Sequence, residues 1–119
     1  MSNALKLKST DLARPLEDVF GTNQFVIYEV AVVHKYVDGN PTNEVDAIRY
    51  TVGDRRTCTK FDVKVNAKTP LLTQEAVNEA LKKEKPIFIA LTGSLAKPYA
   101  MEKGTFVCSA RAESAALVQ

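Results

Sequence analysis

Residues 25–67 read FVIYEVAVVHKYVDGNPTNEVDAIRYTVGDRRTCTKFDVKVNA and contain three segments with the composition of β-strands. Phe25–Val37 is rich in β-branched and aromatic residues and is too continuously apolar to have one solvated face. It therefore predicts a long strand that is buried on both sides for part of its length. The Asp38-Gly39-Asn40-Pro41 sequence predicts a turn, because Asp and Gly tolerate the left-handed backbone of a hairpin.

Two more strands are expected after this turn. Val45–Val52 predicts the return strand, and the alternation of apolar with polar residues predicts one core face and one solvent face. Gly53-Asp54-Arg55-Arg56 predicts the next turn. Thr59–Ala67 alternates most regularly, with an apolar set (Phe61, Val63, Val65, Ala67) against a polar set (Lys60, Asp62, Lys64, Asn66).

A helix and two further strands complete the pattern. Thr73 predicts the N-cap of a helix over Gln74–Glu84. Ile87–Leu91 is expected to be a short strand, residues 92–103 a loop and Thr105–Val118 a last strand. The β-β-β-α-β-β order predicts a mostly β fold, a five-stranded OB-like Greek-key barrel with one helix between strands 3 and 4. We expect residues 1–19 to form an N-terminal arm and residues 20–119 the OB-like domain.

The composition is that of an ordinary globular protein and suits one domain. The chain has 119 residues, of which 45% are hydrophobic and 25% charged, and a net charge of +2. Any binding of nucleic acid must therefore come from local clustering of cations rather than from an overall basic character. No apolar run approaches the roughly 20 residues that span a bilayer, and no signal-peptide pattern opens the sequence. We expect a cytoplasmic protein without a membrane partner.

The sequence offers no catalytic motif. His34 is the single histidine and lies inside an expected strand, where a structural imidazole is the more frequent case. The acidic residues are scattered, and neither a phosphate-binding glycine loop nor a nucleophile motif is present. One His and two Cys are too few for an ordinary metal site. We therefore expect no enzyme, no catalytic residue, no metal and no cofactor.

Binding of single-stranded nucleic acid needs cations for the phosphates and aromatic faces for the bases. The candidate cations lie on the second and third strands and their turn, which is the usual OB ligand face: Arg49, Arg55, Arg56, Lys60 and Lys64. Tyr36 and Tyr50 are the candidate stacking residues. The alternative is that the cations form a solvated outer face or protect a strand edge. Tyr50 also shares the parity of Ile48 and Val52, which favours core packing for its ring.

The chain also resembles a family of small accessory proteins that integrative and conjugative elements of Gram-positive bacteria encode. The similarity covers most of residues 20–118 and consists of spaced scaffold residues: Phe20-Gly21 with Phe25, Asp38-Gly39, Arg49-Tyr50, Val63-Lys64-Val65-Asn66-Ala67, Pro70-Leu71 and Leu117-Val118. The resemblance implies a helicase processivity factor that works beside a relaxase and a helicase on DNA being unwound. The matching positions are glycines, core residues and turns, so the resemblance transfers no functional residue.

The sequence therefore predicts a non-enzymatic single-stranded DNA-binding accessory protein for replication or conjugative transfer of a plasmid, phage or integrative element. A helicase or relaxase is the expected protein partner, and a homo-oligomer is expected because a weakly charged domain needs several copies on one strand. The alternative is a protein–protein adaptor that docks an OB-like barrel on the same machinery without binding DNA.

Overall fold

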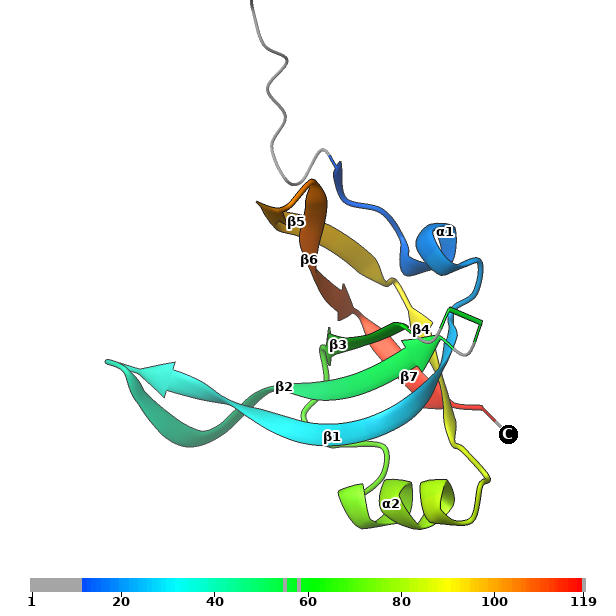
Figure 1. Ribbon diagram of the computed structural model, residues 1–119. Coiled ribbons are helices and arrows are strands. Elements are labelled where there is room, and N and C mark those ends of the chain that lie inside the picture. Colours follow the sequence, from blue (N-terminus) through cyan, green and yellow to red (C-terminus); the bar gives the residue numbers. More distant parts are fainter. Residues whose placement is uncertain (1–11, 55, 58, 119) are drawn as a thin grey trace, which may run out of the picture.

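The computed structural model describes residues 12–54, 56–57 and 59–118, and these form a mostly β fold with two helices (Figure 1). The elements in chain order are α1 Leu16–Phe20, β1 Gln24–Val37, β2 Asn40–Asp54, β3 Thr59–Val65, α2 Gln74–Lys82, β4 Phe88–Thr92, β5 Leu95–Glu102, β6 Thr105–Ala112 and β7 Ser114–Leu117. All seven strands belong to one curled sheet in the order β5-β6-β3-β2-β1-β4-β7, which has the shape of a half-barrel.

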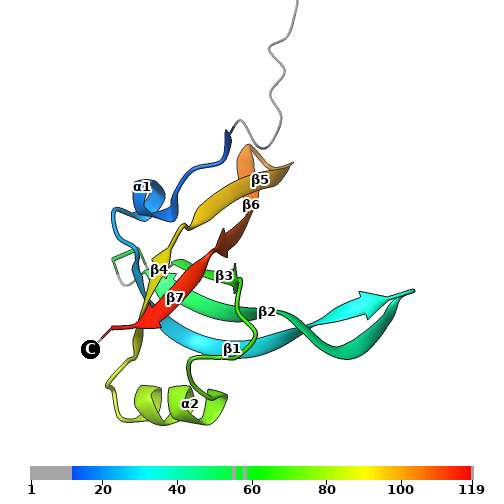
Figure 2. The same cartoon turned by 180° about the vertical axis from the view of Figure 1, so that it is seen from behind.

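The described strands number seven rather than the expected five, and two interruptions explain the difference. The predicted loop at 92–103 is wrong: only Gly93 and Ser94 separate β4 from β5. Likewise, Glu113 alone separates β6 from β7. The two broken strands pair with each other along their length, β4 with β7 and β5 with β6, all antiparallel. In Figure 2, β7 follows directly on the end of β6.

The strand made of β6 and β7 joins the two flanks of the sheet. β6 pairs in parallel with β3, with Lys64 opposite Arg111, whereas β7 pairs with β4. β4 is also hydrogen-bonded to β1, through Gln24–Val26. Neighbouring strands are therefore paired from β3 through β2, β1 and β4 to β7, and β7 follows directly on β6, which pairs with β3. The sheet therefore curls around one core.

The inner faces of β1, β2 and β3 supply most of that core. Phe25, Val26 and Ile27 are buried consecutively, which confirms the strand predicted to be covered on both sides. The alternation predicted for residues 59–67 is also confirmed, since Val63 and Val65 are buried while Lys60, Asp62 and Lys64 are exposed. Leu16 from α1 and Val77 from α2 close the two sides of the core.

The turn signal at Asp38-Gly39 and the cap signal at Thr73 hold, although β2 is longer than predicted and β3 and α2 are each two residues shorter. Asp38 and Gly39 have φ values of 51° and 81° and join β1 to β2 as a two-residue turn, so that Pro41 lies within β2. Gly53 and Asp54 also belong to β2 rather than to the next turn. The Thr73 hydroxyl accepts the Ala76 N–H at 3.1 Å and caps α2.

Candidate nucleic-acid interface

Three cations from three neighbouring strands form a row across the outer face of the sheet. Arg49 of β2 is the cross-strand partner of Lys64 of β3, and Lys64 is the partner of Arg111 of β6. All three are exposed. Neighbouring strands lie about 4.8 Å apart, so the row spans about 10 Å. We call these three residues the cation row.

The cation row is unusual because its members repel one another. Directly opposed like charges destabilise a sheet. Within the described part of the chain, none of the three side chains makes a hydrogen bond or ion pair. The three cations therefore make no contact that would stabilise the fold. Their arrangement is suited to binding an external anion.

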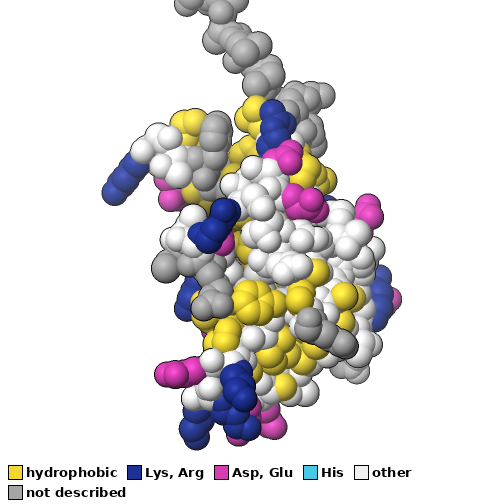
Figure 3. Space-filling model, turned by 90° about the vertical axis from the view of Figure 1, so that its right-hand side faces the viewer, with side chains coloured by type: hydrophobic (Ala, Val, Ile, Leu, Met, Phe, Trp, Pro, Cys, Tyr) yellow, Lys and Arg dark blue, Asp and Glu magenta, His cyan; other side chains and the backbone are white. Residues whose placement is uncertain are grey.

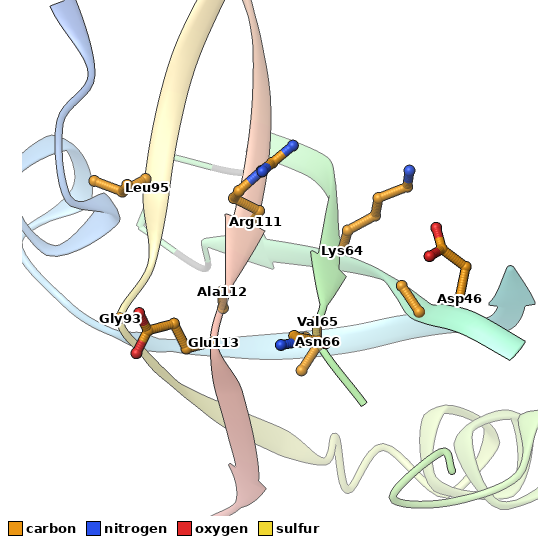
Figure 4. A pocket seen from close by; sticks show the side chains of 10 residues that line it. Asp46, Lys64, Val65, Asn66, Gly93, Leu95, Arg111, Ala112 and Glu113 are labelled. Atoms are coloured by element: carbon orange, nitrogen blue, oxygen red, sulfur yellow. The ribbon is translucent and has the colours of Figure 1, made fainter. Parts of the chain in front are cut away.

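An open depression of about 420 Å³ lies next to the row, where β3 ends and β6 bends into β7. Lys64 and Arg111 extend to the same side of the sheet above it (Figure 4). Asp46 and Glu113 also line the depression, so it carries two cations and two anions. Lys97 of β5 adds a further cation on this face, because it is opposite Ser109, which has the same parity as Arg111.

An acidic row lies beside the cation row. Glu29, Thr51 and Asp62 are aligned across β1, β2 and β3. The Thr51 hydroxyl lies 2.6 Å from Asp62 Oδ1 and 3.2 Å from Glu29 Oε2. These carboxylates lower the positive potential of the face, which limits how strongly one domain can hold a polyanion.

A third row contains an aromatic ring. Lys60 of β3 is opposite Gly53 of β2, and the Tyr28 ring of β1 lies over Gly53. The Lys60 ammonium is 4.2 Å from the centroid of that ring. Lys60 thus lies on the same face as the cation row, displaced from it by four residues along β3.

The prediction that Tyr50 stacks a base is wrong. Its side chain is 1% exposed and belongs to the core, as its parity with Ile48 and Val52 favoured. The Tyr50 hydroxyl accepts the Leu71 N–H at 3.0 Å. Burial raises the pKa of this phenol, and the hydrogen bond from Leu71 partly opposes the shift.

The other predicted residues are dispersed. Arg56 lies at the β2–β3 turn, where its guanidinium donates to the Phe20 carbonyl and lies 3.9 Å from Asp54. It is thus engaged in holding the turn against α1. Tyr36 is 67% exposed and lies near the tip of the β1–β2 hairpin. It is far along that hairpin from Arg49, the cross-strand partner of Lys64. Arg55 lies outside the described residues.

Sequence reasoning missed Arg111 and Tyr28. The alternation of 105–112 already placed Arg111 on one face with Val107 and Ser109. The missing information was the parallel pairing with β3, which joins residues 47 positions apart (64 and 111) and leaves no local signal. Tyr28 follows the core residue Ile27 and so points outward, and the irregularity between Ile27 and Glu29 leaves it without a regular partner on β2.

The described residues contain no group of three or more His, Cys, Asp or Glu that could hold a metal ion. None of the helices in the described ranges is long and apolar enough to cross a membrane. The face that carries α1, β4 and β7 shows hydrophobic side chains gathered in its lower half (Figure 3).

Comparison with known proteins identifies no relative: no family model, no curated protein and no solved structure matches this chain.

Proposed function

We propose that the protein is a non-enzymatic, cytoplasmic accessory factor that binds single-stranded DNA during replication or conjugative transfer of a mobile element. The fold we infer is an OB-type barrel of five long strands, the last two bent at Gly93-Ser94 and at Glu113. Three features support this: the order of strand pairing, the parallel pair of β3 with the last strand, and the helix between the third and fourth strands.

The cation row carries the proposal. OB barrels bind oligonucleotides on the face of strands 2 and 3, between the hairpin that joins strands 1 and 2 and the one that joins strands 4 and 5. Arg49 and Lys64 lie on β2 and β3, and the two corresponding hairpins project from the body of the sheet (Figure 1). Arg49, Lys64 and Arg111 would hold phosphates without regard to base sequence.

A single domain with this mixed face should bind weakly, so we propose that several copies act together. The outer half of β1 offers a pairing edge. β4 pairs with β1 only through Gln24–Val26, and the Gln74 amide binds Val30 N–H at 2.7 Å and Tyr28 O at 3.2 Å. From residue 31 to 37, no described strand pairs with that side of β1. This valine-rich edge is suited to antiparallel pairing with a second copy.

The experiment is fluorescence anisotropy with a labelled single strand of about 30 nucleotides, long enough for two or more OB domains at about 4–16 nucleotides each. The same strand as a duplex is the comparison. The Arg49→Ala/Lys64→Ala/Arg111→Ala variant should lose binding. A Lys82→Ala/Lys83→Ala/Lys85→Ala variant removes the same amount of charge near the end of α2 and should still bind the single strand. Equal binding by the two variants would refute the proposed face.

A second candidate is the protein–protein adaptor, which the hydrophobic face of Figure 3 favours. Val19 of α1 and Leu117 of β7 are 54% and 38% exposed. An exposed apolar patch of several hundred Å² is typical of a docking surface. A helicase or a relaxase is the partner we propose for it. Absence of DNA binding at low salt and tens of micromolar protein would leave the adaptor as the remaining candidate.

A further inference from the structure

Tyr28 lies flat on the outer face of the sheet, between a glycine and a lysine. A Cβ placed on Gly53 would approach Tyr28 Cε2 to 2.7 Å, so the ring rests directly on the backbone of β2. The Lys60 ammonium lies over the ring, 4.2 Å from its centroid. Tyr28 itself is partly exposed and Lys60 is exposed.

The local backbone explains this position. The pairing of β1 with β2 is irregular between Ile27 and Glu29, which leaves Tyr28 without a regular partner and lets its side chain lean over Gly53. Glycine is needed at 53 because any side chain there would occupy the place of the ring. The ring is therefore held against the backbone of β2, and the exposed Lys60 side chain lies over it.

The arrangement has the properties of a base-stacking site in which the Lys60 ammonium takes the place of the base. A cation over an exposed aromatic ring is a weak contact, and a nucleobase has a π-face that can take its place. A lysine that leaves the ring stays tethered to β3 and gains a phosphate as its new partner. The ring would then hold a base while the lysine neutralises the strand that carries it.

We propose that Tyr28 is a base-stacking subsite for single-stranded nucleic acid and that Lys60 covers its free face until a base displaces it. This inference rests on the proposed function and adds a residue that distinguishes single strands from duplexes. Lys60 is four residues from Lys64 along β3, or about 13 Å, so the stacked base and the phosphates at the cation row belong to one short segment. In a duplex the bases are stacked on each other and cannot reach the ring.

The test is photo-cross-linking of the full chain to a single strand that carries 5-iododeoxyuridine, followed by mass spectrometry of the joined peptide. Cross-linking to Tyr28 is expected. Cross-links that map only to other residues, such as Tyr36 or Tyr99 on the hairpins, would overturn the inference while leaving DNA binding intact. A wild-type protein that binds no single strand would overturn the proposed function and this inference together.

Variants give the second readout. Tyr28→Leu should weaken single-strand binding by roughly 5- to 150-fold, the range for removing one base–aromatic stack. Tyr28→Phe keeps the ring and should bind as the wild type does. Equal affinity of Tyr28→Leu and Tyr28→Phe, both shown to be folded by thermal unfolding, would contradict a stacking role.

Discussion

Replacing Lys64 with glutamine should make the protein more stable and, at the same time, a weaker ligand of single-stranded DNA. Lys64 is the middle member of the cation row and has Arg49 and Arg111 as its cross-strand partners. Glutamine keeps an extended polar side chain and removes the charge. The two effects have one cause, because the repulsion that costs stability in the free protein is what a bound phosphate relieves.

The size of the gain follows from the spacing of the strands. Two unit charges about 5 Å apart in water repel by about 0.8 kcal/mol, so the two neighbours of Lys64 contribute about 1.7 kcal/mol. Asp62, two residues along β3 on the same face, attracts Lys64 over about 7 Å and offsets about 0.6 kcal/mol. The net gain at low salt is at most about 1 kcal/mol, because Asp46 and Glu113 of the depression also offset the repulsion, and it raises the melting temperature of a domain of this size by at most about 4 °C.

Thermal unfolding of Lys64→Gln and the wild type, in about 10 mM and about 1 M NaCl, measures this effect. The stabilisation should be present at low salt and lost at high salt, where the Debye length falls to about 3 Å. Lys35→Gln is the matched control: Lys35 pairs with Glu44 at 3.2 Å, so its removal should not stabilise the protein. A destabilised Lys64→Gln, or a gain that is unchanged by salt, would refute the reasoning.

Four further predictions concern the salt dependence of binding, the buried Tyr50 and the cap of α2. With the three cations of the row and Lys60 on phosphates, the logarithm of the single-strand affinity should fall with the logarithm of the salt concentration with a slope of about −2.8, since each cation releases about 0.7 counterion. Arg111→Gln should reduce the slope to about −2.1, and a slope that matches eight or more contacts would contradict the count. Tyr50→Phe should destabilise the protein by about 1–3 kcal/mol in chemical denaturation, because the Leu71 N–H loses its acceptor. Burial raises the pKa of Tyr50 above its ordinary value of 10.0, so the phenol ionises in the unfolded state before it does in the folded state. The stability of the wild type should therefore fall more steeply above pH 10 than that of Tyr50→Phe. Parallel curves of stability against pH would show that Tyr50 titrates normally. Thr73→Ala should cost about 1 kcal/mol, seen in thermal unfolding, through loss of the cap on Ala76, and an unchanged melting temperature would mean that the cap is not formed.

Local chemistry made much of the fold predictable. The two-residue turn at Asp38-Gly39 is specified by residues that adopt positive φ, and the cap at Thr73 by a hydroxyl in the right place. Strict alternation in 59–67 fixed which side of β3 faces the core. These features depend on neighbours in sequence, which is why they could be predicted.

The features that could not be predicted depend on residues distant in sequence. Gly93 and Pro98 are typical of a loop, yet β5 forms because β6 pairs along it, with Pro98 opposite Cys108 next to an irregularity. The cation row could not be seen without the pairing of Lys64 with Arg111. The parity of residues 48–52 places the Tyr50 ring in the core, and a ring buried there cannot also stack a base.

The most direct test of the central claim is a ¹H–¹⁵N NMR titration of the protein with a short single-stranded oligonucleotide at low salt. We expect amide shift changes concentrated on β2, β3 and β6 around Arg49, Lys64 and Arg111, with little change on β4 and β7. Changes confined to the face of β4 and β7, or no change at all, would contradict the claim that the cation row is a surface for single-stranded DNA.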